Sequence, residues 1–212
     1  FPQGIAPAQE LQEFRDFAMR GFKTILVEKS DLTTGTSGRY HGLLHSGGRY
    51  AVKDPAAASE CIQENQILRR IMPHCIEDTG GFFVLTPWDD PAYAPRFVEG
   101  CRMAGIPVEE VSSAEMLRME PRLNPQISAC YRVPDGSADS FKAADSLADG
   151  ARQYGALILP YHQGVNLICS RNRVTGALVH DLKQDETFEM QADLVINAAG
   201  AWCGQISAMA GV

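Results

Sequence analysis

The feature that most constrains the fold is a short apolar run that ends in an acid. Residues 23–28 (KTILVE) follow directly after residues 10–20, in which Leu11, Phe14 and Phe17 recur on one helical face. A continuous apolar run of this length is typical of a strand that is buried on both faces, as strands in a parallel sheet are. A helix followed at once by such a strand favours an α/β fold.

Helix and strand alternate again towards the C-terminal end. A helix that begins near Asp139 is expected to reach about Tyr154. A last buried strand is expected at residues 193–197, before a turn into a helix that carries Trp202. Shorter strands are expected between them, at residues 156–161, 165–169, 174–180 and 187–190.

The middle of the chain has a different character. Asp54-Pro55 opens a predicted helix, because Asp caps a helix N-terminus and Pro fits its first turn. The expected inner stripe of this helix is Ile62, Ile67, Leu68 and Ile71. Prolines then separate predicted strands at residues 80–86 and 127–133 and predicted helices at residues 93–104 and 113–119. This pattern favours an α+β lobe inserted into the α/β fold.

Charge and apolar patterning disfavour several classes of protein. The chain has 19 Lys and Arg against 26 Asp and Glu, a net charge of −7, which disfavours nucleic acid as a partner. No apolar run approaches the roughly 18 residues that span a bilayer, and the first residues lack a signal-peptide pattern. We therefore expect a soluble, cytoplasmic protein.

Six cysteines stand far apart, with no C-x-x-C pair among them. This spacing favours reduced core thiols over a disulfide framework or a metal site, so no metal is expected. The cysteines are Cys61, Cys75, Cys101, Cys130, Cys169 and Cys203.

A long loop rich in glycine and polar residues follows the first predicted strand, from Lys29 to Tyr50. Long loops in compact domains are usually functional. Its glycines let backbone amides approach a ligand closely, and Thr36 and Ser37 add hydroxyl donors for a phosphate. Taken alone, the loop could also be an ordinary solvated connection.

The same loop carries two arginines and two histidines. Arg39 and Arg49 can hold an anionic substrate in a bidentate way. His41 and His45 can donate a hydrogen bond to an isoalloxazine edge or take a proton. The combination favours a ligand site over a chance arrangement.

Two further features sit at predicted strand ends. Glu28 ends a strand where dinucleotide-binding folds hold a pair of ribose hydroxyls, although an exposed acid there is also common. Residues 197–202 (NAAGAW) let the chain pass under a cofactor without a side-chain clash, or form a plain strand-to-helix turn. Pro134-Asp-Gly136 is most simply a turn.

Together these stretches resemble a known family. From about residue 15 to 211 the chain resembles the anaerobic, FAD-dependent glycerol-3-phosphate dehydrogenases, their A-type component in particular, within the D-amino-acid-oxidase-like flavoprotein superfamily. The matching stretches are residues 15–16, 20–21, 25–28, 38–39, 41–47, 49–52, 64–68, 133–136 and 197–200. The resemblance implies an FAD-binding, Rossmann-like sheet of the glutathione-reductase type, formed by residues 1–76 and 135–212. Residues 77–134 would be part of the inserted α+β substrate-binding lobe.

The resemblance also implies a reaction and its site. FAD would oxidise sn-glycerol 3-phosphate to dihydroxyacetone phosphate, and partner subunits at the inner membrane would pass the electrons to quinone. Arg49 and Tyr50 would face the glycerol phosphate and form the catalytic set with His45. The implied cofactor-binding residues are Glu28, Lys29, Thr36, Ser37, Arg39, His41, Gly42, Leu43, His45, Gly164, Val165, Ala198, Ala199, Gly200 and Trp202.

The chain departs from the family at its start. The three glycines of the dinucleotide fingerprint would fall at Ile5, Pro7 and Glu10. Pro lacks an amide donor, and Glu would bring a carboxylate to the place of the pyrophosphate. The strand before them would have only residues 1–4. We therefore expect a chain truncated at both ends that does not hold FAD stoichiometrically by itself.

Two alternatives stay open at this point. One is an FAD-dependent dehydrogenase or oxidase of the same superfamily that acts on a 2-hydroxy acid or an amino acid. The other is a non-catalytic fragment that binds no flavin.

Overall fold

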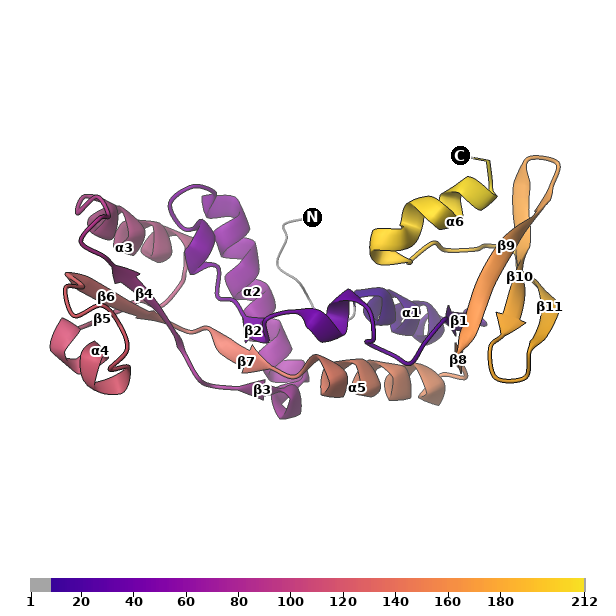
Figure 1. Cartoon of the computed structure of the whole chain (residues 1–212), viewed down its shortest axis with the longest axis horizontal. Coiled ribbons are helices and arrows are strands. Elements are labelled where there is room, and N and C mark those ends of the chain that lie inside the picture. The colour runs from indigo at the N-terminus through magenta and orange to yellow at the C-terminus, as the bar shows by residue number, and fades with distance from the viewer. Residues whose placement is uncertain (1–8, 212) are drawn as a thin grey trace. The chain divides into compact units, whose positions relative to one another are not determined.

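The computed structural model describes residues 9–211, which divide into two compact units (Figure 1). The middle unit consists of residues 41–139, and the terminal unit consists of residues 9–40 and 140–211. The division predicted from the sequence instead groups residues 41–76 with the terminal segments. The FAD-binding and substrate-binding roles expected of those segments stay predictions.

The terminal unit contains a parallel strand pair and an antiparallel meander. β1 pairs in parallel with β8, with Ile25 opposite Leu157, and helices α1 and α5 pack against each other. β10 lies between β9 and β11 in a three-stranded antiparallel sheet. The elements are α1 (Gln9–Met19), β1 (Ile25–Glu28), the 3-10 helix η1 (Thr36–Arg39), α5 (Ser140–Gln153), β8 (Leu157–Pro160), β9 (His162–Ser170), β10 (Arg173–Asp181), β11 (Glu186–Gln191), the 3-10 helix η4 (Gly200–Trp202) and α6 (Cys203–Met209).

The helix–strand order of this unit confirms the predicted α/β fold. Leu11, Phe14 and Ala18 are buried along one face of α1, as their spacing predicts. The crossover helix α5 leads directly into β8, which is how parallel neighbours are connected.

Two expectations about buried strands are wrong. Ile25 in β1 is 48% exposed and the rest of the strand is half-buried, because among residues 9–211 only β8 pairs with it. Residues 193–197 form no strand, and Leu194 and Ile196 are 70% and 48% exposed. An apolar run becomes a strand only where a neighbour completes its hydrogen-bond ladder, and the described residues offer it none.

The N-terminal fingerprint positions fall at the edge of the described region. Ile5, Pro7 and the strand expected at residues 1–4 lie outside the described residues. Glu10 is the second residue of α1.

The middle unit contains two small antiparallel sheets and three α-helices. In one sheet β7 lies between β2 and β3, and in the other β6 lies between β4 and β5. The elements are β2 (Leu43–Leu44), the 3-10 helix η2 (Gly48–Tyr50), α2 (Pro55–Ile71), the 3-10 helix η3 (Pro73–Cys75), β3 (Ile76–Glu77), β4 (Gly81–Leu85), α3 (Tyr93–Ala104), β5 (Glu109–Val111), α4 (Ser113–Met119), β6 (Ala129–Val133) and β7 (Gly136–Ala138).

Helix α2 begins as predicted, since the Asp54 side chain accepts a hydrogen bond from the Ala57 N–H at 3.1 Å. Its predicted inner stripe is half right. Ile62 and Leu68 are buried, whereas Ile67 and Ile71 are exposed, so α2 buries a narrower face than the sequence pattern predicts.

Helix α3 packs closely on the segment before α2. A Cβ added at Gly100 would lie 2.3 Å from the carbonyl oxygen of Ala51, so this contact requires glycine. The core around it is a cluster of Ala51, Ala58, Ile62, Phe97, Cys101, Ala104, Ile106 and Val133. A second cluster, Val111, Met116, Ile127 and Cys130, lies between α4 and the sheet of β4, β5 and β6.

The cysteines are distributed unevenly between the two units. All six are free thiols. Those of the middle unit are buried, as predicted for core thiols, and those of the terminal unit are exposed. The buried ones are Cys61, Cys75, Cys101 and Cys130, and the exposed ones are Cys169 and Cys203. Over the described part of the chain, none of the helices combines the length and apolarity needed to cross a membrane.

Candidate functional site

His45 and Asp135 form a hydrogen-bonded pair in the middle unit. Nδ1 of His45 lies 3.3 Å from Oδ2 of Asp135. The backbone N–H and the hydroxyl of Ser46 donate to the other carboxylate oxygen at 2.7 and 2.6 Å. The side chain of Asp135 is only 9% exposed, while that of His45 is 28% exposed. The pair therefore has a buried acid and an imidazole that still reaches solvent.

The carboxylate of Asp135 is held in its charged form. Burial acts to raise the pKa of Asp135, but hydrogen bonds from His45 and Ser46 lower it by more, so the net pKa lies below the usual value. A negative charge therefore stands beside the His45 ring at neutral pH.

Two side chains of α2 hold the backbone on both sides of this pair. The Asn65 amide, which is buried, donates to the carbonyl oxygens of His45 and Pro134 at 3.1 and 3.3 Å. Arg69 donates to Asn65 Oδ1 at 2.8 Å and to the carbonyl oxygens of Pro134 and Asp135 at 3.0 and 3.1 Å. We call these two residues the Asn65–Arg69 clamp. It fixes two segments that are about 90 residues apart in sequence.

The strand β4 also approaches Asp135 closely. A Cβ added at Gly81 would lie 2.7 Å from Cβ of Asp135, so the acid fits only against a glycine. Pro134-Asp-Gly136 is thus not the simple turn expected, because β6 and β7 run directly on either side of Asp135.

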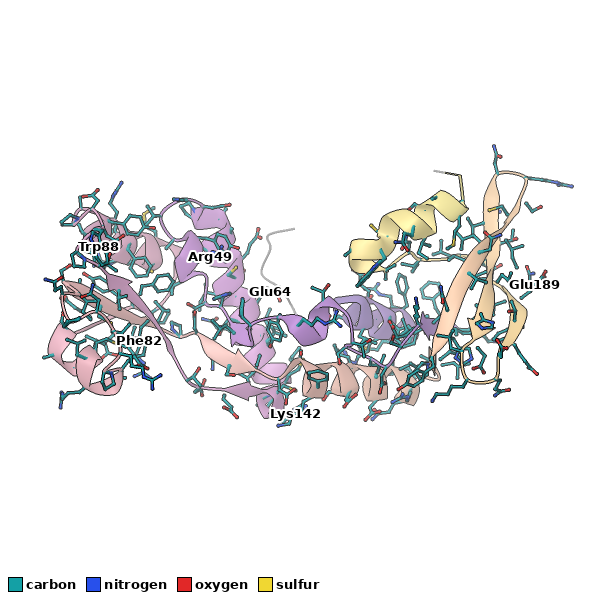
Figure 2. The ribbon with its side chains drawn as sticks, viewed as in Figure 1. Arg49, Glu64, Phe82, Trp88, Lys142 and Glu189 are labelled. Carbon is teal, nitrogen blue, oxygen red and sulfur yellow. The ribbon has the colours of Figure 1, made fainter. Side chains whose placement is uncertain are left out.

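Arg49 and Tyr50 follow the pair by a few residues, on η2, which packs against α2. Arg49 is exposed and labelled in Figure 2. Tyr50 is partly buried against the core cluster that contains Ala51 and Ala58. The tyrosine therefore anchors the turn, and the guanidinium of Arg49 stays accessible to an anion.

The residues before His45 are tied to β7. His41 is exposed, its Nδ1 accepts the Leu43 N–H at 3.1 Å, and its ring centroid lies 5.0 Å from that of His45. Gly42 has a φ of 77°, and its carbonyl oxygen accepts the Ala138 N–H at 2.8 Å. Leu43 is half exposed at the start of β2. The structure therefore brings His41, Leu43 and His45 into one short segment.

The predicted cofactor residues of the terminal unit begin at Glu28. This residue ends β1, and its Oε1 accepts the Ser30 N–H at 2.8 Å. A carboxylate has about four lone-pair sites, so it can still accept the hydroxyls of a ribose. Lys29 follows it and is exposed. An acid at the carboxyl end of a parallel strand fits the adenosine half of a dinucleotide.

The loop after Glu28 folds into η1, which contains Thr36, Ser37 and Arg39 and contacts α5. A Cβ on Gly38 would lie 2.1 Å from the Thr33 carbonyl oxygen, so this glycine serves the tight packing of the loop itself.

The remaining predicted residues lie on β9 and around η4. Gly164 and Val165 are on β9, which contacts β1. Ala198 and Ala199 precede η4, which contains Gly200 and Trp202. Trp202 is half exposed, and a Cβ added at Gly35 would lie 3.7 Å from its ring, so the loop after β1 and η4 are neighbours.

The structure thus assigns the predicted site residues to both units. His41, Gly42, Leu43, His45, Arg49 and Tyr50 belong to the middle unit, and the others belong to the terminal unit. The sequence did not single out Asp135, Ser46, Asn65 or Arg69. The one available signal was an acid between a predicted strand (residues 127–133) and a predicted helix that begins near Asp139, a pattern that predicts a turn.

The fold and these sites define a class of protein. Residues 4–212 match the FAD dependent oxidoreductase family, DAO, so the chain belongs to that family. FAD is the cofactor of this class. The class also accounts for the parallel pair β1–β8 with an acid at its end.

Within this class, the chain is similar to the A-type components of anaerobic glycerol-3-phosphate dehydrogenases. It is 46% identical over 208 residues to the A1 component of that enzyme from Haloferax volcanii, with 93% of the chain and 35% of the relative covered. It is 44% identical over 188 residues to the corresponding component from Escherichia coli K12, with 89% and 35% covered. The chain therefore spans about a third of the length of these relatives. The expected resemblance is confirmed.

Solved structures support the fold. L-proline dehydrogenase from P. horikoshii aligns with a TM-score of 0.75 at 22% identity, covering 95% of this chain and 53% of that one. The glycerol-3-phosphate dehydrogenase from Bacillus halodurans complexed with FAD aligns with a TM-score of 0.60 at 21% identity, covering 86% and 30%. At these identities the likeness confirms the FAD-binding fold class and does not distinguish substrates.

Proposed function

We propose that this chain is part of a dehydrogenase that uses FAD to oxidise sn-glycerol 3-phosphate to dihydroxyacetone phosphate. The observation that carries the proposal is one short segment of the middle unit. Residues 45–50 combine an imidazole held by a buried carboxylate with an exposed guanidinium. Oxidation of a phosphorylated secondary alcohol needs both a proton acceptor and an anion-binding cation. Similarity to components of anaerobic glycerol-3-phosphate dehydrogenases supports the same substrate.

Each of these residues has a defined part in the reaction. The guanidinium of Arg49 binds the substrate phosphate with paired hydrogen bonds. Tyr50, packed against the core, keeps Arg49 in place and adds a phenol near the same ligand. His45 takes the proton from the C2 hydroxyl as the alcohol becomes a ketone. FAD supplies the two-electron acceptor for the hydride that leaves C2.

In this proposal the cofactor-binding residues come from the two segments, residues 1–76 and 135–212, that the family resemblance assigns to the FAD-binding sheet. Glu28 accepts hydrogen bonds from the adenosine ribose, with Lys29 beside it, and Gly164 and Val165 offer backbone groups to the adenine. The remaining contacts to the pyrophosphate and flavin come from Thr36, Ser37, Arg39, His41, Gly42, Leu43, His45, Ala198, Ala199, Gly200 and Trp202. The fit rests on the carboxylate of Glu28, which lies at the carboxyl end of β1.

The proposal extends to the electron acceptor. Electrons pass through partner subunits to a membrane quinone, and the protein works at the cytoplasmic side of the inner membrane. The names of its relatives, which are single components of an anaerobic dehydrogenase, support an enzyme of several subunits.

A flavin-reduction assay tests the substrate. The dehydrogenase that contains this chain is purified with FAD, made anaerobic, and mixed with sn-glycerol 3-phosphate, glycerol, a 2-hydroxy acid or an amino acid. We expect the oxidised flavin absorbance to bleach with sn-glycerol 3-phosphate and not with glycerol, which lacks the phosphate. Bleaching by the 2-hydroxy acid or amino acid alone would move the substrate to a carboxylate and refute the proposal, and a protein that retains no flavin would refute it as well.

A further inference from the structure

The hydrogen-bond pattern around Asp135 specifies which nitrogen of His45 carries a hydrogen. The backbone N–H of Ser46 can only donate, and the Ser46 hydroxyl lies 2.6 Å from the same oxygen, so Oδ1 of Asp135 is an acceptor. An ionised carboxylate accepts on both oxygens. The 3.3 Å contact from His45 to Oδ2 therefore requires a hydrogen on Nδ1. In the neutral ring Nε2 then keeps its lone pair.

The neighbouring histidine has the opposite arrangement. The Leu43 backbone N–H donates to Nδ1 of His41 at 3.1 Å. Nδ1 of His41 is therefore an acceptor, and the neutral ring carries its hydrogen on Nε2. Two histidines four residues apart thus have different tautomers, and the Nδ1 hydrogen of His45 points at the Asp135 carboxylate.

We propose that Asp135 is a positioning residue that holds His45 as a proton acceptor at Nε2. The proposal rests on the proposed function in one respect, that the accepted proton comes from the substrate hydroxyl. The carboxylate fixes the ring and its tautomer, and it stabilises the imidazolium once Nε2 has taken the proton. The Asn65–Arg69 clamp keeps the carboxylate in place, because it bonds the backbone of both His45 and Asp135.

Other polar and titratable groups lie near His45 and Asp135. The His41 ring lies 5.0 Å away from the same loop, and Arg69 of α2 lies on the backbone of Asp135. Burial raises the pKa of the Cys61 thiol on α2, and the negative charges of Glu60 and Asp135 raise it further. Among these groups, and over the described residues, Asp135 is the one that hydrogen-bonds to the His45 ring.

Nuclear magnetic resonance of the histidine rings tests the proposal without any turnover. Protein labelled with ¹³C and ¹⁵N in histidine is titrated with pH, and the signals are assigned with His41→Gln and His45→Gln. In the wild type at high pH we expect His45 to be protonated on Nδ1 and His41 on Nε2. Asp135→Asn should turn an amide N–H toward Nδ1, because Ser46 still donates to Oδ1, so the neutral His45 ring should carry its hydrogen on Nε2 instead. Asp78→Asn, which removes a carboxylate that pairs with Arg69, should leave the hydrogen of His45 on Nδ1.

Either of two results would overturn the proposal. One is a neutral His45 that carries its hydrogen on Nε2 in the wild type, a measurement that needs no folded variant. The other is a folded Asp135→Asn protein whose neutral His45 still carries its hydrogen on Nδ1.

A kinetic arm separates this proposal from the proposed function. In the FAD-loaded enzyme, Asp135→Asn should lower kcat for sn-glycerol 3-phosphate by up to about 100-fold with little change in KM. If the ring measurements agree but no glycerol phosphate is oxidised, the proposed function fails and the placement of His45 stands. Turnover of the Asp135→Asn enzyme with an unchanged kcat would leave the function intact and refute the role of Asp135.

Discussion

The buried carboxylate of Asp135 makes the stability of the fold depend on pH. Burial raises its pKa, and the hydrogen bonds from His45 and Ser46 lower it to below the usual value. Because the folded-state pKa is lower than that of an unfolded Asp, about 3.9, the charged form stabilises the fold above that pH. This stabilisation is lost as the pH falls through the lowered pKa.

We therefore expect Asp135→Asn to reduce the free energy of unfolding by about 1–3 kcal/mol at pH 7, since charged hydrogen bonds are weakened in a buried site. The difference from the wild type should narrow as the pH falls below about 4. Urea unfolding at a series of pH values measures it. A difference that stays constant from pH 7 to pH 3 would contradict the assignment, and Asp78→Asn serves as a control at an exposed carboxylate.

Arg49 is expected to act on substrate rather than on folding, because its side chain is exposed. Arg49→Ala should lower kcat/KM for sn-glycerol 3-phosphate by roughly 10–150-fold, the equivalent of a charge-assisted contact of about 1.5–3 kcal/mol. Arg49→Lys should recover part of the loss, since it keeps the charge without the planar fork. Steady-state kinetics with a dye acceptor decides this, and an Arg49→Ala enzyme with unchanged kcat/KM would remove Arg49 from the site.

Glu28 is expected to act on flavin retention. Glu28→Gln keeps the shape of the side chain and loses its charge, so FAD should bind roughly 10–150-fold more weakly. Flavin fluorescence during dialysis of the loaded protein gives the dissociation constant. Glu189→Gln is a matched control on the exposed strand β11 of the same unit (Figure 2). Equal loss of FAD from both variants would contradict the ribose contact.

The sequence identifies a candidate site residue when the residues that mark it are neighbours in the chain, and misses it when its partners are distant in sequence. The loop with His41, His45 and Arg49 was identified because its glycines and polar residues are contiguous. Asp135 was assigned to a turn, since its partners lie about 90 residues earlier and only the folded structure brings them together.

At the scale of elements, periodicity and caps predicted most helices and strands. Helix α3 (Tyr93–Ala104) and helix α4 (Ser113–Met119) begin and end where the sequence places them, because helix hydrogen bonds and caps are local. The strand predicted at residues 193–197 did not form, since a strand depends on a partner that its own sequence does not specify. The short strands β2, β3, β5 and β7 were not predicted for the same reason.

The packing of α3 gives a prediction at this scale. Gly100→Ala should destabilise the middle unit by about 1–3 kcal/mol, because the added methyl group meets the backbone oxygen of Ala51. Gly204→Ala on α6 is a control in which the added methyl group meets no atom within 4 Å. Alanine there should stabilise the helix by up to about 1 kcal/mol. Chemical denaturation of both variants measures the difference, and similar effects would show that α3 is not closely packed at Gly100.

At the scale of the whole molecule, the fold class was predictable and the division into units was not. The order of helices and strands indicates α/β with an α+β region. The boundaries of the compact units, after residues 40 and 139, depend on which segments pack together, for example β2 and β7. Those contacts join residues that are far apart in the chain, so composition and local pattern do not locate them.

The two units differ in the accessibility of their thiols, so a thiol reagent can distinguish them. Burial raises the pKa of Cys101 to about 11 and also raises the pKa values of Cys61 and Cys130, so these thiols are poor nucleophiles as well as covered. At pH 8 an alkylating reagent should add two groups to the native protein, at Cys169 and Cys203, and the other four only after the middle unit opens. Intact mass spectrometry along a urea series would then measure the unfolding of the middle unit separately from that of the terminal unit. Rapid addition of more than two groups without urea would contradict the burial of these thiols.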